Sequence, residues 1–170
     1  LRQTLQLMKF EELDQISAIM LVCDADRMEG DEKRRKLLAD RDEDADFSLD
    51  VESMKLNVGI KKIPLHTFVF PDNSGKGNLE NLLLQTAEVE YPELLKLATE
   101  YVEKASNIQD SLKKEQNAKK AKVGCIANAM KPGKANQVSI ADDNWVSERT
   151  IRECSMLRTL NMTLQEMISL

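Results

Sequence analysis

The chain has 170 residues, of which 42% are hydrophobic and 31% are charged, and its formal net charge at pH 7 is −5. A chain of this length and composition is expected to fold as one domain, or as a domain with a small appendage. The net negative charge, taken alone, argues against an undiscriminating nucleic-acid binder, but the distribution of charge along the chain is more informative. No apolar run approaches the ~20 residues that a membrane-spanning helix needs, and no segment has the pattern of a signal peptide, so we expect no membrane partner.

The cysteines and the single histidine exclude two further classes of protein. Cys23, Cys125 and Cys154 are scattered and odd in number, which argues for free thiols in a reducing compartment and against a disulfide-linked secreted fold. With one histidine, His66, and no Cys-x-x-Cys pair, the sequence has no pattern for a structural zinc site. We therefore expect a cytoplasmic protein.

The first part of the chain is predicted to contain two strands and two helices. Residues 1–8 have the spacing of an amphipathic helix, and the unbroken apolar run at 16–23 predicts a strand buried on both faces, as in a parallel sheet. A short charged helix is expected at 31–39. Residues 40–59 are highly charged with little periodicity, so we expect a surface excursion that is partly disordered. The apolar run at 65–70 predicts a second buried strand, which ends in a turn.

The rest of the chain is predicted to be helical. Helices are expected at 78–88, with Asn78 as the N-cap, at 92–105, which has a clear 3.6-residue apolar period, and at 117–130. A loop with the single tryptophan leads to a last helix, which begins at an N-cap, Ser147. Strands separated by helices favour an open, mainly parallel α/β sheet flanked by helices, in which sites form beyond the carboxyl ends of the strands.

Two aspartates end the first predicted strand. Asp24 and Asp26 follow the apolar run directly, and because burying two unpaired carboxylates would cost several kcal/mol each, we expect them where the chain turns out of the core. Two like charges this close repel unless a cation lies between them, and carboxylate oxygens are ligands that Mg²⁺ prefers. Mn²⁺ is the alternative ion. An acidic turn neutralised by Arg27 or Lys33 is the other interpretation that this pattern allows.

A third carboxylate is expected at the same place. Glu80 lies in the first turn of the helix that follows the second strand, where the helix dipole favours an ionised carboxylate. Because the carboxyl ends of adjacent parallel strands share one edge of a sheet, Asp24, Asp26 and Glu80 are predicted to meet around one cation. Ordinary decoration of a helix start is the alternative for Glu80. Asp72 and Asn73 lie nearer the strand end and are additional candidates, although they are equally typical of a turn.

Lysines are the candidate phosphate ligands. Residues 112–134 contain seven lysines and one acid, whereas residues 24–50 contain eleven acids and six bases, so a basic and an acidic region are expected on one molecule. A lysine that reaches a phosphate would stabilise the charge on the transferring group. Three candidates begin the helix predicted at 117–130 and a fourth lies in a glycine-flanked loop: Lys119, Lys120, Lys122 and Lys76. A solvated position is the alternative for each of them.

The order of these motifs resembles that of the Toprim-like proteins. An apolar strand ending in "DAD", then "PDNSGKGNLENLLL", "KAK" and a lone tryptophan before a final helix is similar to an uncharacterised Toprim-like family of bacteria and archaea. More distantly, it is similar to the Toprim nuclease domain of the OLD (overcoming lysogenization defect) family. The resemblance spans nearly the whole chain. It implies a Rossmann-like parallel sheet that holds Mg²⁺ through a glutamate on the first strand and an Asp-x-Asp on a later one.

The resemblance also implies a role for several residues. Asp24 and Asp26 match the metal-binding Asp-x-Asp, and Glu80 matches the glutamate of a segment written "ENLL" here. Lys120 is the best match to a lysine of the following helix, with Lys122 close behind. The first-strand glutamate has no counterpart in the sequence, and we expect it upstream of Leu1, in a strand that this chain lacks.

Three functions are compatible with these residues. The resemblance implies Mg²⁺-dependent phosphodiester chemistry on nucleic acid, as nuclease-like hydrolysis or nicking. A non-catalytic module that binds nucleic acid or a nucleotide, with a partner protein or as a homo-oligomer, is the alternative, and a sugar-nucleotide transferase is the third. We expect a Toprim-like core at residues 1–110, with the charged insertion at 40–59, and a helical extension at 111–170 packed on the core.

Overall fold

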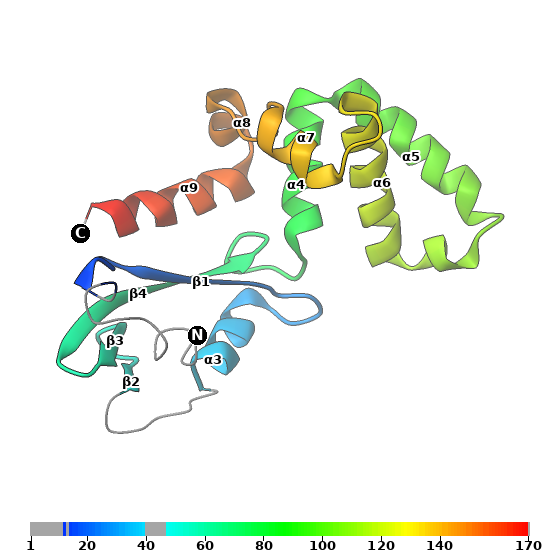
Figure 1. Ribbon diagram of the computed structural model, residues 1–170. Helices are drawn as coiled ribbons and strands as arrows, with labels where there is room; N and C mark the ends of the chain where they lie inside the picture. Colours follow the sequence, from blue (N-terminus) through cyan, green and yellow to red (C-terminus); the bar gives the residue numbers. More distant parts are fainter. Residues whose placement is uncertain (1–11, 13, 40–46, 170) are drawn as a thin grey trace.

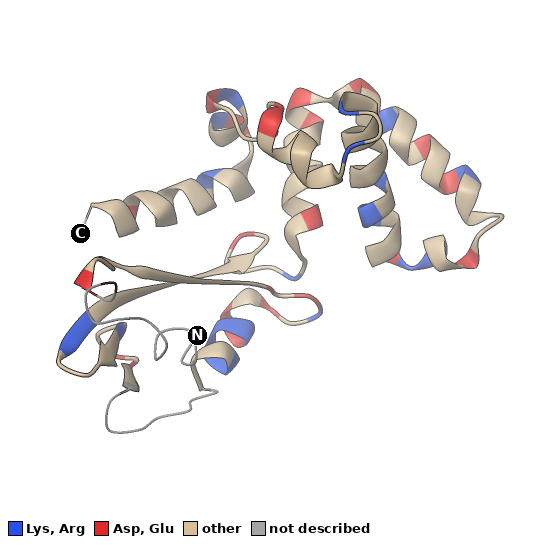
Figure 2. Ribbon diagram, in the orientation of Figure 1, with Lys and Arg blue, Asp and Glu red and all other residues tan. Residues whose placement is uncertain are grey.

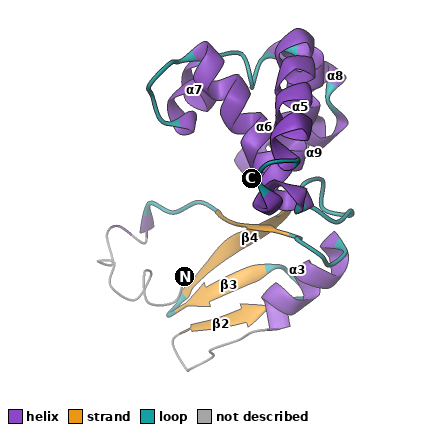
Figure 3. Ribbon diagram, turned by 90° about the vertical axis from the view of Figure 1, so that its right-hand side faces the viewer, coloured by secondary structure: helices purple, strands orange, loops and turns teal. Residues whose placement is uncertain are grey.

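The computed structural model describes residues 12, 14–39 and 47–169, so the helix predicted at 1–8 lies outside the described residues. Figures 1 and 3 show a small sheet with helix α3 (Gly30–Ala39) on one side and helices α4 (Leu79–Glu90) and α9 (Ser155–Ile168) on the other. The other helices extend from α4 away from the sheet: α5 (Pro92–Ser106), α6 (Glu115–Met130), α7 (Asn136–Asp142), α8 (Glu148–Glu153) and a short 3-10 helix, η1 (Asp110–Lys113).

The sheet is mixed rather than mainly parallel. Its order is β1 (Ile19–Asp24), β4 (Lys61–Phe70), β3 (Lys55–Val58), β2 (Phe47–Asp50). Strands β1 and β4 are parallel, whereas β4 with β3 and β3 with β2 are antiparallel. The mixed α/β class is therefore confirmed, but the predicted mainly parallel sheet is wrong. The reason lies in the long strand β4, which pairs with β3 along residues 61–64 and with β1 along residues 65–70.

Two strands of the sheet lie in the segment that the sequence predicts as a partly disordered surface excursion. Strands β2 and β3 form a hairpin across residues 47–58, so the prediction is wrong for this part, while residues 40–46 lie outside the described residues. One of the charged residues that suggest disorder in the sequence, Asp50, instead stabilises the hairpin turn. Its carboxylate accepts hydrogen bonds from two backbone N–H groups of the hairpin loop. Leu56 is only 1% exposed and packs against Ile19 of β1.

Strand β1 is less buried than its apolar run predicts. It is an edge strand of the sheet, hydrogen-bonded to β4, and no other strand of the described residues pairs with it. None of its residues is fully buried, and Val22 is 51% exposed. The prediction of burial on both faces is wrong for β1 and correct for the carboxyl-terminal half of β4, where Phe68 and Val69 are fully buried.

The helices predicted at 78–88, 92–105 and 117–130 are confirmed as α4, α5 and α6, although α6 begins earlier, at Glu115. The N-cap predicted at Ser147 is also confirmed, because Ser147 Oγ accepts a hydrogen bond from Thr150 N at 3.1 Å at the start of α8. The last helix is interrupted at Cys154, whose extended backbone (ψ 114°) ends α8 and begins α9.

One hydrophobic cluster joins the helices on both sides of residue 110. It includes Leu83 of α4, Ala98 of α5 and Ile126 of α6, together with the fully buried Trp145. The Trp145 indole N–H donates to Ser139 Oγ at 3.1 Å. The division of the chain into units at residue 110 stays a prediction. No helix of the described residues is both long and apolar enough to cross a membrane.

Candidate functional site

The carboxyl ends of β1 and β4 lie side by side. Asp24 is opposite Phe70 in the parallel register, and the backbone N of Ala25 donates to the carbonyl oxygen of Phe70 at 3.0 Å. The loops that follow the two strands, residues 25–29 and 71–78, therefore leave the sheet at the same edge. This is the edge at which the sequence predicts a site.

A glycine allows these two loops to touch. The backbone N of Gly30 donates to the carbonyl oxygen of Ser74 at 2.7 Å. A Cβ atom at this position would lie 2.4 Å from the carbonyl oxygen of Asn73, which is far closer than atoms of neighbouring residues approach. The close approach of the two backbones thus requires glycine at position 30 and fixes one loop against the other.

Asp24, the last residue of β1, contacts the start of α4, where Glu80 lies. A carboxylate oxygen of Asp24 accepts a hydrogen bond at 2.9 Å from the backbone N of Leu79, the first residue of the helix. Glu80 is the next residue and is partly exposed. Negative charge is stabilised at a helix N-terminus. Asp24 therefore holds the start of α4 against the end of β1.

Asp26 has a backbone conformation that is rare for a residue with a side chain. Its φ is +57°, and its backbone N donates to the carbonyl oxygen of Gly77 at 2.6 Å. A non-glycine residue in the left-handed region costs on the order of 1 kcal/mol or more, and such residues concentrate at functional sites. The side chain is exposed at this turn, just beyond the end of the strand.

The described residues contain no group of three or more His, Cys, Asp or Glu side chains that could hold a metal ion. The carboxylates of Asp24, Asp26 and Glu80 have the chemistry that Mg²⁺ or Mn²⁺ requires, but in this part of the chain they do not form such a group. Their role as metal ligands stays a prediction.

Asp72 and Asn73 serve the turn after β4. The Asp72 carboxylate accepts hydrogen bonds from the backbone N of Ser74 at 3.0 Å and of Gly75 at 2.8 Å. Burial alone would raise the pKa of Asp72, but these hydrogen bonds outweigh it and hold the pKa below its ordinary value of 3.8. The side-chain oxygen of Asn73 accepts from the backbone N of Val69 at 2.8 Å. These contacts favour the turn interpretation of both residues.

A groove of about 1160 Å³ lies between the two loops and the first turns of α6. Of the residues that the structure describes, two acids line it, Asp26 and Glu115, and five cations line it: Arg27, Lys33, Lys76, Lys114 and Lys119. Figure 2 shows basic residues along α3 and near the start of α6. We call the space enclosed by these residues the basic groove.

Lys119 is the lysine of α6 that lines the basic groove, whereas Lys120 and Lys122 do not line it. The Lys119 side chain is 23% exposed, and its Nζ lies 3.3 Å from Asn81 Oδ1 of α4 and 2.5 Å from Glu115 Oε1. The sequence contains a signal for this choice. Of the three lysines, Lys119 projects nearest to the middle of the buried face of α6, at helical spacing from its buried apolar residues.

Arg27 and Lys33 also line the basic groove, although the sequence gives them only the role of neutralising an acidic turn. Burial raises the pKa of Cys23, Lys33 lowers it, and Asp24 and Asp26 raise it, so these charges act on the same strand end. Arg27, Lys33 and Lys114 form no ion pair with any residue that the structure describes. Lys76 lies 3.3 Å from a carboxylate oxygen of Glu29, in an exposed pair.

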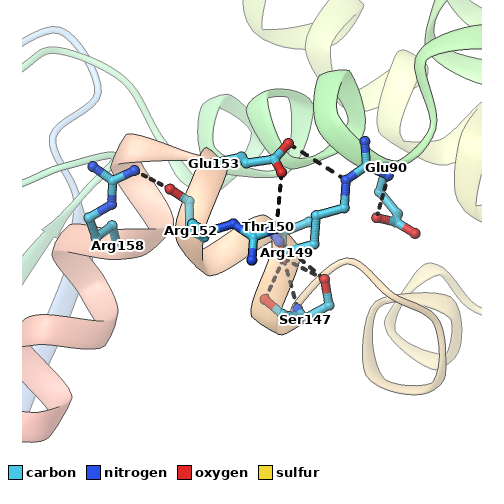
Figure 4. Close-up of polar contacts among 7 residues, drawn as sticks. All are labelled: Glu90, Ser147, Arg149, Thr150, Arg152, Glu153 and Arg158. Atoms are coloured by element: carbon cyan, nitrogen blue, oxygen red, sulfur yellow. Dashed lines mark hydrogen bonds and ion pairs between the residues drawn. The ribbon is translucent and has the colours of Figure 1, made fainter.

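A second basic region lies on α8 and the start of α9 (Figure 4). Arg149 lies 3.6 Å from carboxylate oxygens of both Glu90 and Glu153, and Arg152 lies 3.3 Å from Glu153. The guanidinium group of Arg158 donates to the carbonyl oxygen of Arg152. We call Arg149, Arg152 and Arg158 the arginine cluster. All three are occupied by contacts within the chain.

Over residues 1–166, the sequence matches a protein family described as "Protein of unknown function (DUF3226)". Comparisons with curated proteins and with solved structures gave no match. The basic groove is therefore the feature from which a function has to be inferred.

Proposed function

Because the chain belongs to the family described as "Protein of unknown function (DUF3226)", which names no activity, we propose a function from the basic groove: it binds the phosphate backbone of nucleic acid. The observation that carries the proposal is the excess of cations among the described residues that line the groove, five against two acids, in a chain whose net charge is −5. A cleft lined by one sign of charge concentrates the field and attracts ligands of the opposite sign. Phosphates supply that charge at regular spacing along a nucleic-acid strand.

The side chains of the basic groove favour a backbone ligand over a stacked base. None of the described residues that line it is aromatic, whereas stacking of bases generally needs aromatic rings. Four side-chain amides line it instead: Asn78, Asn81, Gln116 and Asn117. Amide N–H groups donate to phosphate and sugar oxygens, which fixes the position of a strand without reading its sequence. We therefore expect binding that depends little on base sequence.

The start of α6 adds to the positive character of the basic groove. Residues 114–117 line the groove, and α6 has no side-chain hydrogen bond at its N-cap, Lys114. Backbone N–H groups at an uncapped helix start, together with the helix dipole, favour an anion. This contribution supplements that of the lysine and arginine side chains.

Binding of a labelled oligonucleotide, measured by fluorescence anisotropy in EDTA, tests this proposal. We expect the double variant K33Q/K119Q to bind about tenfold more weakly, because it loses two charge-assisted contacts of roughly 0.7 kcal/mol each after solvent screening. The logarithm of the affinity should fall linearly with the logarithm of the salt concentration, with a slope of about −0.9 for each phosphate contacted in a duplex.

The matched control is K120Q/K122Q, which removes the same charge from α6 at positions that do not line the basic groove. It should retain most of the wild-type affinity. Absence of binding by the wild-type protein, or an equal loss in the two double variants, would contradict the proposal.

A second proposal is Mg²⁺-dependent phosphodiester chemistry, as nicking or hydrolysis of the same nucleic acid, with Mn²⁺ as the alternative ion. It is supported by the positions of Asp24 and Asp26 at the strand edge, by the exposed side chain of Asp26 in the basic groove, and by the Toprim-like sequence motifs. Asp24, Asp26 and Glu80 are the proposed ligands, and the ion would activate water and stabilise the leaving oxygen. Without a preassembled group of ligands, the carboxylates would have to move together when the ion binds.

Nicking of supercoiled plasmid in Mg²⁺ distinguishes the two proposals. The variant D24N/D26N should lose nicking while it still binds the oligonucleotide in EDTA, because the amide oxygen introduced at position 24 can still accept the hydrogen bond from the backbone N of Leu79. Asp31→Asn, a change of an exposed acid in the first turn of α3, is the control and should nick normally. Unaltered nicking by D24N/D26N would contradict the proposed Mg²⁺-dependent chemistry at these aspartates and would leave the proposal of nucleic-acid binding intact.

A further inference from the structure

Lys119 is held by two neighbours inside the basic groove. Its Nζ lies 2.5 Å from Glu115 Oε1, one helical turn earlier on α6, and 3.3 Å from Asn81 Oδ1 on α4. Asn81 Oδ1 also accepts a hydrogen bond from the backbone N of Asn78 at 3.2 Å, so it is itself fixed at the start of α4. The ammonium group of Lys119 is therefore placed at the point where α4 and α6 meet the groove.

The two partners of Lys119 differ in what they do to an incoming anion. Asn81 is neutral and orients the ammonium group without opposing an anion. Glu115 is ionised and lines the same groove, and its own side chain is 82% exposed, whereas that of Lys119 is 23% exposed. The hydrogen bond from Lys119 and its charge both lower the pKa of Glu115, so this carboxylate remains ionised at neutral pH.

We propose that Glu115 competes with the nucleic-acid phosphate for Lys119. Its carboxylate contacts the Lys119 ammonium group in the free protein and must move away when a phosphate oxygen takes its place. This inference rests on the proposed binding of nucleic acid in the basic groove. The exchange requires little rearrangement, because Glu115 lies on the solvent side and Lys119 stays anchored by Asn81. Glu115 thereby lowers the affinity and keeps weak or isolated anions from occupying the groove.

A second ion pair, formed by the groove residue Lys76 with Glu29, which does not line the basic groove, provides an internal comparison. Lys76 and Glu29 lie 3.3 Å apart, and their side chains are 60% and 59% exposed. An exposed pair is strongly screened by solvent, so it opposes phosphate binding less than the pair made by the partly buried Lys119. The structure thus ranks the two acids, with Glu115 the stronger competitor.

A double-mutant cycle in oligonucleotide binding tests the competition. At low ionic strength, E115Q should bind about two- to fivefold more tightly than the wild-type protein, because one ion pair no longer has to be broken. This gain should disappear in the K119Q background, since without Lys119 there is no contact for Glu115 to occupy. E29Q should gain less than about twofold.

Asp110→Asn is the control for the general loss of a negative charge. Asp110 forms an ion pair with Lys113 at 2.6 Å, and neither residue lines the basic groove, so D110N should leave the affinity unchanged. The thermal unfolding midpoints of all variants show whether each is folded.

The outcomes separate this inference from the proposed function. If the wild-type protein does not bind the oligonucleotide, both are overturned. If it binds, and K119Q weakens binding, but E115Q binds no more tightly than D110N, only the competition is overturned. A gain from E115Q that is equally large with and without Lys119 would also overturn it, because the effect would then be one of net charge.

Discussion

The basic groove and the arginine cluster are both rich in cations, yet they differ in what those cations contact. In the arginine cluster, Arg149 lies within 3.6 Å of two carboxylates and Arg152 within 3.3 Å of one. In the basic groove, Arg27, Lys33 and Lys114 form no ion pair with any residue between 14 and 39 or between 47 and 169. Arg149 and Arg152 are thus paired with carboxylates of α4 and α8, whereas the basic groove has charge available for a ligand.

This contrast shows that the number of basic residues on a surface does not measure its capacity to bind an anion. Exposed ion pairs within a helical region add little to stability, but they remove the charge that a phosphate would meet. A cavity and unpaired cations must coincide before a surface attracts a polyanion strongly. In the part of the chain that the structure describes, the basic groove meets both conditions.

Gly30→Ala is the substitution with the largest expected effect, because it acts on the backbone that shapes the basic groove. The new Cβ would lie 2.4 Å from the carbonyl oxygen of Asn73, so the loops after β1 and β4 must separate. We expect a loss of about 1–3 kcal/mol in the free energy of unfolding, measured by chemical denaturation, and weaker binding of the oligonucleotide.

Gly124→Ala is the matched control for that substitution. A Cβ at Gly124, on α6, would lie 3.5 Å from Asn136 Nδ2, an ordinary contact. Since glycine disfavours a helix interior, G124A should stabilise the protein by about 0.5–1 kcal/mol. Equal effects of the two substitutions on stability would contradict the close loop contact at Gly30.

Loss of charge in the arginine cluster should leave oligonucleotide binding nearly unchanged, unlike loss of charge in the basic groove. R149Q/R152Q is expected to lower the free energy of unfolding by no more than about 1 kcal/mol and to leave oligonucleotide affinity within about twofold of the wild type. The ion pairs are exposed, with arginine side chains 55% and 72% exposed, and their charge is already balanced. A loss of affinity of about tenfold in this variant would remove the distinction between the two regions.

The smallest expected effect is the pH dependence that Asp72 gives to the loop beside the basic groove. Its folded-state pKa lies below the ordinary value of 3.8, so its stabilising contribution is fully present above that value. The contribution is lost as the pH falls through the folded-state pKa. Chemical denaturation of Asp72→Asn should therefore show a shallower loss of stability below about pH 4 than the wild type. An unchanged pH dependence would argue against the hydrogen bonds that the Asp72 carboxylate accepts from the backbone N–H groups of Ser74 and Gly75.

The helical half of the molecule is largely predictable from the sequence, and the sheet is not. Apolar residues at helical spacing and the cap at Ser147 are local signals, so α4, α5 and α6 and the start of α8 follow from them. The partners of β4 depend on contacts between distant segments. A charged stretch also conceals the β2–β3 hairpin, because its acidic residue Asp50 forms the turn.

The candidate site is predictable in part, for the same reason. The apolar run that precedes Asp24 and Asp26 correctly marks the carboxyl end of β1. The prediction that the carboxyl end of the second apolar strand, β4, lies beside it is also correct. The choice among the α6 lysines requires the phase of the helix, which is set by the packing of Val123 and Ile126 in the core. Arg27 and Lys33 become groove residues only through the contact between the two loops at Gly30, which no local pattern reveals.

Chemical-shift mapping with an oligonucleotide in EDTA tests most directly whether the ligand lies in the basic groove. The backbone amide signals of residues 25–33, 76–81 and 114–119 should shift together as the oligonucleotide is added, and those of residues 149–158 should remain in place. Shifts centred on residues 149–158, or no shifts in the three groove segments, would contradict binding in the basic groove.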